Sequence, residues 1–368
     1  MAFGKMKYYS LKNILTRNAQ YNMIFGERSN GKTFAVLEHG LEDYAITGNQ
    51  MAIVRRWQDD FKGKRAATMF DNLVNAGVIS RVTGGEWSGV YYYASRWFLC
   101  KFDEDGKRTI QDEPFCFAFA ISAMEHDKST SYPKIKTVMF DEFLTRSMYL
   151  PDEFILFMNV LSTIIRERND VIIFMCGNTI NQYSPYFVEM GITHIKQMTP
   201  GDIDIYEYGD SGLRVAVEFA DSPNKSKPSD VYFAFDNPKL AMITGKNGIW
   251  EISVYPHCPI KFLPKEILFM YFIQFNGELL QCEIIQHENL TFTYIHQKTT
   301  ELKNPDSELI YSPEYDPRPN WKRKITKPTT PLEKKIASFF VTDKVFYQDN
   351  EIGEIVRNYL MWCKGGEQ

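Results

Sequence analysis

The stretch FGERSNGKTF, residues 25–34, decides the fold of the first half of the chain. Its pattern is glycine, four residues, then glycine, lysine and threonine, which is typical of a loop that holds phosphate groups. A charged surface turn is the competing interpretation, so the flanking sequence has to decide. The run at 21–25 is short and apolar, as in a buried strand, and the run at 32–45 has helical spacing. Strand, glycine loop and helix follow in the order that a phosphate loop requires.

The predicted nucleotide site uses this loop and the first turn of the following helix. The N–H groups of the loop and the positive end of the helix dipole favour negative charge there. We expect Lys32 to reach the β- and γ-phosphates and the Thr33 hydroxyl to bind Mg²⁺. The residues expected around the phosphates are Gly26, Glu27, Arg28, Ser29, Asn30, Gly31, Lys32 and Thr33.

Alternating strands and helices in the first half of the chain predict an α/β fold. The apolar runs at 50–56, 114–122, 135–143 and 170–180 are typical of strands, and 151–168 is typical of a helix. Near-continuous apolar strands indicate a parallel sheet covered by helices on both faces. The expected fold class is a P-loop NTPase core of the kind that has an additional strand and a catalytic glutamate.

The run VMFDEF, residues 138–143, narrows the reaction. Asp141 ends an apolar strand and is placed to hold Mg²⁺ through water, while Glu142 can polarise a water for attack on the γ-phosphate. A solvated acidic pair at a strand end is the simpler alternative. Small-molecule kinases do not need the second carboxylate, because their substrate is the nucleophile. The chain has no Asn-Lys-x-Asp motif for reading guanine, so ATP is favoured over GTP.

Three polar residues further along have two interpretations each. Asn178 follows the next strand and either senses the γ-phosphate and orients the attacking water, or caps the strand end. Arg166 and Arg168 close an apolar helix and either complement its dipole or reach the nucleotide of a neighbouring subunit. An arginine of the second kind stabilises charge on the transferred phosphoryl group. Chemistry alone leaves the choice for the two arginines even.

Five segments together resemble the DNA encapsidation proteins of small tailed bacteriophages, which are ring ATPases that drive double-stranded DNA into a preformed prohead. In chain order the segments are FGERSNGKT, AIVRRW, KSTSYPKIKTVMFDEF, STIIRER and CGNTINQYSPYF. The run KS-x-x-YP before the carboxylate strand is the element most specific to the family. The resemblance covers about the first half of the chain.

The resemblance implies roles for residues of the predicted site. It assigns Lys32 and Thr33 to phosphate and Mg²⁺ binding, Asp141 to the Mg²⁺ side and Glu142 to the catalytic base. It also matches Arg166 to an arginine finger that acts on the neighbouring subunit.

Other basic residues are matched less completely by the resemblance. Lys128 corresponds to a residue that the family places at the subunit interface, with a solvated loop lysine as the alternative. Arg55 and Arg56 match a family Arg-Arg pair to which no chemical task is assigned. Gln58 stands where the family often has a lysine, so a DNA contact there would fall to Lys62, Lys64 and Arg65.

The second half of the sequence predicts a different domain. After an ATPase domain over 1–197, the polar run of 198–262 is expected to be a connecting segment. Three strand-like runs open a domain expected over 263–368, and the family's C-terminal domain resembles a ribonuclease-H-like nuclease with three such strands. A working nuclease of this type needs a metal-binding carboxylate on its first strand, but this sequence has no acidic residue from Tyr271 to Phe275. Glu278 and Glu283 follow and are expected to face solvent. We therefore expect a nuclease fold that does not cut.

The composition indicates an ordered, soluble, intracellular protein. Of 368 residues, 44% are hydrophobic and 15% aromatic, and the net charge is −4, so nucleic acid would be met by local patches. Six scattered cysteines suit a reducing compartment, and no apolar run approaches the length of a membrane span. The basic segment 318–335 is either a solvated face or a contact with DNA or RNA phosphates.

The expected function is an ATP-driven double-stranded DNA translocase with ATP and Mg²⁺ in its site. By resemblance it would act as a ring of identical subunits, a pentamer, on a phage prohead and its portal in the host cytoplasm, with packaging RNA as a further partner and no membrane. A P-loop phosphotransferase acting on a small substrate is the alternative, and it predicts turnover indifferent to DNA. A nucleotide-gated scaffold is the third hypothesis, and it predicts that Glu142→Gln changes little.

Overall fold

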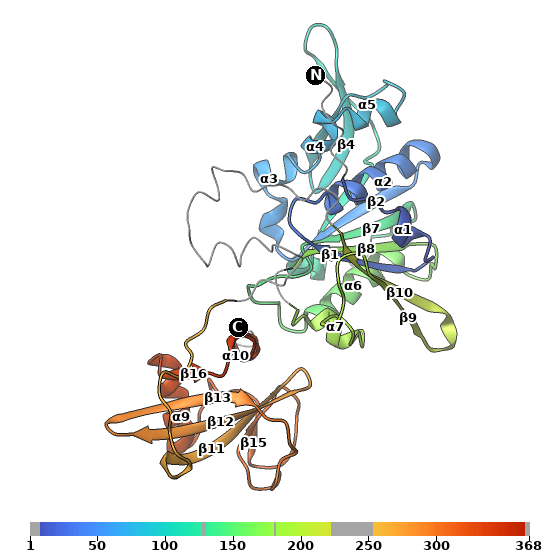
Figure 1. The fold of residues 1–368 in the computed structure, drawn as a ribbon. Coiled ribbons are helices and arrows are strands. Elements are labelled where there is room, and N and C mark those ends of the chain that lie inside the picture. The colour runs from blue at the N-terminus through green and yellow to red at the C-terminus, as the bar shows by residue number, and fades with distance from the viewer. Residues whose placement is uncertain (1–7, 127–129, 180–181, 222–252, 365–368) are drawn as a thin grey trace. The chain divides into compact units, whose positions relative to one another are not determined.

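The computed structural model describes residues 8–126, 130–179, 182–221 and 253–364. These residues divide into two compact units. Residues up to 145 and from 152 to 221 form the first unit, and 146–151 together with 253–364 form the second. Lys128, for which the resemblance implies a place at the subunit interface, lies outside the described residues. Figure 1 shows the elements of each unit.

The first unit contains a sheet that, in the described residues, has ten strands in the order β3-β4-β6-β2-β7-β8-β1-β10-β9, with β5 paired to β4. Six neighbouring strands, from β6 to β10 in this order, run parallel. The strands are β1 (Tyr21–Gly26), β2 (Gln50–Arg55), β3 (Gly89–Tyr93), β4 (Arg96–Phe102), β5 (Arg108–Ile110), β6 (Cys116–Ala120), β7 (Ile135–Asp141), β8 (Ile172–Asn178), β9 (Ile203–Tyr208) and β10 (Leu213–Ala220).

Helices cover both faces of this sheet, as the continuous apolar strands predict. Side chains alternate between faces along a strand, so Met139 packs in the core beneath α2, whereas Phe140 meets Phe157 of α6 with ring centroids 4.8 Å apart. Figure 1 shows α2 and α6 on opposite sides of the strands. The helices of this unit are α1 (Lys12–Leu15), α2 (Lys32–Thr47), α3 (Gly63–Ala67), α4 (Asp71–Asn75), α5 (Val78–Val82), α6 (Glu153–Ile165) and α7 (Pro185–Glu189).

The order of the central strands brings the predicted site together. The additional strand β8 lies between β1, which leads into the phosphate loop, and β7, which ends in the carboxylates. Gly26 at the end of β1 is paired with Asn178 at the end of β8, and Asp141 is paired with Cys176. The carboxyl ends of these parallel strands therefore meet at one edge of the sheet, where ligands of open α/β sheets bind.

The start of the expected connecting segment is instead part of this sheet. β10 pairs in parallel with β1, and β9 pairs antiparallel with β10, so residues 203–220 extend the sheet of the first unit. Six successive residues of β10 are buried, because the strand lies between β1 and β9. A boundary between 197 and 198 therefore does not separate two units. Residues 222–252 of the expected segment 198–262 lie outside the described residues.

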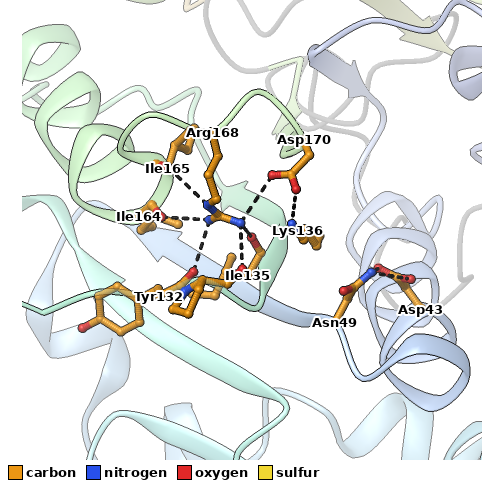
Figure 2. A network of polar contacts seen from close by, with 10 residues as sticks. Asp43, Asn49, Tyr132, Ile135, Lys136, Ile164, Ile165, Arg168 and Asp170 are labelled. Carbon is orange, nitrogen blue, oxygen red and sulfur yellow. Dashed lines mark hydrogen bonds and ion pairs between the residues drawn. The ribbon is translucent and has the colours of Figure 1, made fainter.

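The apolar helix α6 is shorter than the sequence pattern suggests, and both of its arginines follow its end. Arg166 stands after the last helical residue with a positive φ of 53°. Figure 2 shows the guanidinium of Arg168 surrounded by backbone carbonyls. Arg168 donates hydrogen bonds of 2.9–3.3 Å to the carbonyl oxygens of Tyr132, Pro133, Ile135, Ile164 and Ile165. Arg168 therefore joins the end of α6 to the start of β7.

Replacing Arg168 by Ala is expected to lower the free energy of unfolding by about 2–4 kcal/mol, because several carbonyls lose a charged donor at once. The matched variant Arg166→Ala should change stability by less than about 0.5 kcal/mol, since its guanidinium is exposed and donates to the Thr130 carbonyl at 2.9 Å. Urea denaturation of both variants measures the difference. Equal stabilities for the two variants would contradict a structural role for Arg168.

The second unit contains a sheet of order β15-β14-β11-β12-β13-β16 in the described residues. Its three leading strands, β11, β12 and β13, are antiparallel neighbours joined by tight turns, as expected. The strands are β11 (Ile267–Phe275), β12 (Glu278–His287), β13 (Leu290–Gln297), β14 (Ile310–Tyr311), β15 (Trp321–Lys322) and β16 (Val345–Tyr347), with helices α9 (Pro331–Val341) and α10 (Asn350–Lys364).

Candidate nucleotide site

The phosphate loop is shaped by two glycines that no other residue replaces without strain. At Gly26 a Cβ atom would lie 2.7 Å from the carbonyl oxygen of Ala220 in β10, so the close approach of two strands excludes a side chain. Gly31 caps the N-terminus of α2 with a φ of 96°, a left-handed conformation that favours glycine. The chain therefore turns from β1 into a helix of 16 residues whose N-terminus faces the edge of the sheet.

The side chain of Lys32 is folded over this loop. Its Nζ donates to the carbonyl oxygens of Gly26 and Glu27, at 3.2 and 2.7 Å, and to Oδ1 of Asn30 at 3.0 Å. Oδ1 of Asn178, at the end of β8, is 3.4 Å away. These partners are neutral oxygens, and burial lowers the pKa of the Lys32 ammonium to about 8. A phosphate group would give this buried cation the negative partner that favours its charged form.

The hydroxyl of Thr33 donates to Oδ1 of Asp141 at 2.9 Å, which joins the first turn of α2 to the end of β7. Asp141 is 4% exposed. Oxygen ligands of this kind suit Mg²⁺, which takes one or two protein groups and completes its shell with water and substrate phosphates. Among the described residues no group of three or more His, Cys, Asp or Glu forms an all-protein cage. The donor set therefore fits Mg²⁺ bound together with a nucleotide.

The carboxylates of Asp141 and Glu142, at the end of β7, are neutralised by an arginine of β2. Arg55 forms an ion pair with Oδ2 of Asp141 and lies 3.7 Å from Oε2 of Glu142. The side chain of Glu142 is 64% exposed, so its carboxylate can hold a water molecule. The next arginine, Arg56, points into the protein and binds Glu153 at the start of α6. The two arginines thus serve different partners.

The structure brings together most of the predicted site. The loop residues, Lys32, Thr33, Asp141 and Glu142 meet at one edge of the sheet, and Asn178 lies beside Lys32. Within the loop, Asn30 is buried, whereas Arg28 and Ser29 are exposed.

Arg166 is not part of this cluster. Its neighbour Arg168 contacts the start of β7, whereas Asp141 ends the same strand, about 20 Å away along a seven-residue strand. Arg166 therefore lies toward the opposite edge of the sheet from the phosphate loop of its own chain.

Sequence reasoning left Arg55 and Arg56 without a task. It also overlooked Glu153, which binds Arg56, and Tyr186, whose hydroxyl donates to Glu153. The sequence did contain a signal for the pairing of Arg55 with the carboxylates, since one apolar strand ends in two arginines and another in two carboxylates. β2 and β7 are parallel neighbours, with Val54 paired to Phe140, so opposite charges meet at adjacent strand ends. The partner of Arg56 comes from α6 and leaves no comparable local pattern.

A family model supports the resemblance drawn from the motifs. The model described as Podovirus DNA encapsidation protein (Gp16) matches residues 99–229, a span that contains β7, α6 and β8. The expected resemblance to phage DNA encapsidation proteins is confirmed.

Two phage proteins are similar in sequence to part of the chain. A DNA packaging protein of Bacillus phage B103 is 27% identical over 177 residues, which cover 46% of this chain and 48% of that protein. The DNA packaging protein of Bacillus phage phi29 is 23% identical over 188 residues, 50% of each chain. The chain therefore spans about half the length of the curated relatives it matches.

Two solved structures share the fold over nearly the whole chain. The phi-28 DNA packaging motor has a TM-score of 0.54 and 19% identity, covering 98% of this chain and 99% of the other. The bacteriophage phi-29 genome packaging motor assembly has a TM-score of 0.54 and 17% identity, covering 95% and 96%. At these identities the likeness is one of fold, and it confirms the expected α/β fold with a large, mainly parallel sheet.

Proposed function

We propose that this chain hydrolyses ATP and couples the reaction to the movement of double-stranded DNA into a phage prohead. The observation that carries the proposal is the contact between the Thr33 hydroxyl and Asp141, beside the Lys32 ammonium, at the edge where the phosphate loop meets the carboxylate strand. The match of residues 99–229 to the DNA encapsidation family supports DNA packaging as the purpose of the reaction.

The residues of the loop have defined tasks in this reaction. Lys32 holds the β- and γ-phosphates by its charge, and the loop N–H groups orient them at the N-terminus of α2. Thr33 and Asp141 would hold Mg²⁺, which would supply positive charge to the bound phosphates. Asn178 lies 3.4 Å from the Lys32 ammonium and is positioned to sense the γ-phosphate.

Glu142 acts as the base that orients and deprotonates the attacking water. Its carboxylate follows Asp141 directly and is exposed enough to hold that water, while Arg55 lies 3.7 Å away and limits repulsion between the adjacent carboxylates. A kinase acting on a small substrate has no need of this second carboxylate. That difference favours hydrolysis over phosphotransfer.

Arg166 completes the site of a neighbouring subunit in a ring, which we propose to be a pentamer. The position of Arg166 toward the opposite sheet edge supports action in trans, because its neighbour Arg168 contacts the start of β7, about 20 Å along the strand from Asp141. Positive charge at the transferred phosphoryl group stabilises the transition state. We propose Lys128 as a second interface residue.

The partners follow from the same proposal. DNA would be held through its phosphate backbone by local basic groups, because the net charge is −4. In the second unit, Lys322, Arg323, Lys324 and Lys327 line one shallow hollow and are candidates for phosphate contacts with DNA or packaging RNA. Some basic groups of this segment have acidic partners, since Lys322 lies 3.7 Å from Glu333 and Arg318 pairs with Asp306 and Asp316.

The remaining expectations concern assembly and the second unit. The prohead and its portal would be the docking partners, in the host cytoplasm. Among the described residues no helix has the length and apolar character needed to cross a bilayer. We propose that the second unit is a nuclease-like fold that does not cut, because β11 carries no acidic residue and both glutamates of β12 have partners. Glu278 accepts from Gln297, and Glu283 is bound to Gln281 and His296.

The proposal is tested by steady-state ATP hydrolysis with and without proheads and double-stranded DNA. We expect the wild-type rate to rise by at least tenfold in the assembled complex, because an isolated subunit lacks the neighbour's arginine. Brisk hydrolysis by the isolated protein that ignores DNA would instead favour the phosphotransferase. Nucleotide binding with no turnover in either state would favour the nucleotide-gated scaffold.

A further inference from the structure

The backbone of the proposed base is held in an unfavourable conformation. Glu142 has a φ of 61°, in the left-handed region that side chains other than glycine and asparagine rarely adopt. Such a conformation is unfavourable for a glutamate and persists only where its surroundings enforce it. The question is therefore which groups enforce the turn that presents the Glu142 carboxylate.

Arg56 supplies the contacts on one side of this turn. Its Nη1 donates to the carbonyl oxygen of Glu142 at 3.3 Å, and its Nη2 donates to that of Phe143 at 2.9 Å. On the other side, the N–H of Phe143 donates to the carbonyl oxygen of Cys176 in β8 at 3.2 Å. The turn is thus fixed between a side chain from β2 and the backbone of β8.

The guanidinium is itself fixed by a buried carboxylate. Nε and Nη2 of Arg56 donate to the two oxygens of Glu153 at 2.7 and 2.8 Å, and the hydroxyl of Tyr186 donates to the same carboxylate at 2.8 Å. The side chains of Arg56 and Glu153 are 7% and 0% exposed. A planar fork held in this way serves Glu153 and two carbonyls at once, which a lysine ammonium cannot do.

We propose that Arg56, anchored by Glu153, is a positioning residue that sets the turn of Glu142 and thereby the place of its carboxylate. The inference rests on the proposed role of Glu142 in hydrolysis. Arg56 binds the backbone carbonyls of the turn, whereas Arg55 pairs with the carboxylates of Asp141 and Glu142. Arg56 therefore acts on the chemical step and leaves nucleotide binding to Lys32 and Thr33. A misplacement of about 1 Å at a reacting group costs about a hundredfold in rate.

The first test needs no nucleotide. Hydrogen exchange of the amides at 142–144 is compared in wild type, Arg56→Lys and Tyr186→Phe, with Arg81→Lys as the matched control. Arg81 also bridges two carboxylates, those of Glu38 and Glu42, but is 56% exposed. We expect exchange in the turn to accelerate at least tenfold in Arg56→Lys and less in Tyr186→Phe, which removes one hydrogen bond from the anchor. Unchanged exchange in both variants would overturn the proposal whatever the protein's function.

The second test separates positioning from general loss of structure. In the assembled complex, Arg56→Lys should lower kcat about 10- to 100-fold while the Kd for a fluorescent ATP analogue stays within about twofold. In a Glu142→Gln background the same change should have less than about a twofold effect, because the carboxylate to be positioned is gone. A full effect in that background would overturn the proposal.

The two arms also separate this inference from the proposed function. If the wild type binds ATP but never hydrolyses it, the proposed function fails, and the exchange result still decides whether Arg56 holds the turn. If Arg56→Lys fails to fold, hydrogen exchange and kcat are both measured on Tyr186→Phe. An unchanged kcat in Tyr186→Phe, together with unchanged exchange, would then overturn the proposal.

Discussion

Replacing Glu142 by Gln is expected to lower the rate of ATP hydrolysis about 10²- to 10⁴-fold, the usual contribution of a positioned general base. The amide keeps the size of the side chain but cannot accept the proton of the attacking water. Nucleotide affinity should change by less than about threefold, because the contacts of Lys32 and of Thr33 with Asp141 are untouched. Single-turnover hydrolysis in the assembled complex and the Kd of an ATP analogue measure the two quantities.

Two controls make this result specific. Glu86→Gln removes an exposed glutamate of the same unit and should hydrolyse at the wild-type rate. Lys32→Ala should lose nucleotide binding, because the buried cation over the loop is removed. A Glu142→Gln variant with wild-type turnover would contradict the role of this residue and would support the scaffold hypothesis. A variant that no longer binds nucleotide would show that Glu142 supports the site in another way.

The sequence predicts well those parts of the site whose residues lie close together along the chain. The phosphate loop needs a strand before it and a helix after it, and both are contiguous in sequence with Gly26 and Gly31. Asp141 and Glu142 follow an apolar run that forms β7. Parallel pairing then brings these strand ends to one edge, so the meeting of loop and carboxylates follows from the fold class.

The parts that sequence predicts poorly depend on contacts between distant segments. β10 looks like part of a polar connection until its pairing with β1 buries it. Arg56 and Glu153 lie 97 positions apart, and the sequence around either residue does not indicate that it binds the other. The end of α6 is set by the backbone of Arg166, whose positive φ no propensity of arginine suggests. In each case a tertiary contact overrides the local preference.

The two arginines after α6, for which chemistry alone leaves two interpretations even, have different surroundings in the structure. Arg168 is used within its own subunit, where it binds the carbonyls at the end of α6 and the start of β7 (Figure 2). Arg166 is exposed and donates to the carbonyl oxygen of Thr130. Its guanidinium can therefore leave that contact at small cost, as a residue that reaches a neighbouring subunit must.

Replacing Arg166 by Ala is accordingly expected to lower hydrolysis in the assembled complex about 10³- to 10⁵-fold, the contribution typical of an arginine finger. Stability and nucleotide affinity of the isolated subunit should stay close to wild type, because the Arg166 guanidinium is exposed and donates to the carbonyl of Thr130, outside the cluster of site residues. Single-turnover hydrolysis is the appropriate measurement, since it does not require the subunits of the ring to hydrolyse ATP one after another. A wild-type rate for Arg166→Ala in the assembled complex would exclude the finger.

Mixing variants then decides whether the arginine acts in trans. An Arg166→Ala subunit keeps Glu142, and a Glu142→Gln subunit keeps Arg166, so an interface between them holds both groups when the finger comes from the neighbour. In a ring assembled at random from equal amounts, roughly a quarter of the interfaces are complete, and hydrolysis should recover accordingly. Mixing Arg166→Ala with the double variant Arg166→Ala/Glu142→Gln supplies no finger and should recover nothing. If the first mixture hydrolyses ATP no faster than the second, Arg166 acts in the site of its own chain, against the separation along β7. The reason is that in the first mixture every subunit that still carries Glu142 lacks Arg166, so a finger acting in cis could not complete any site.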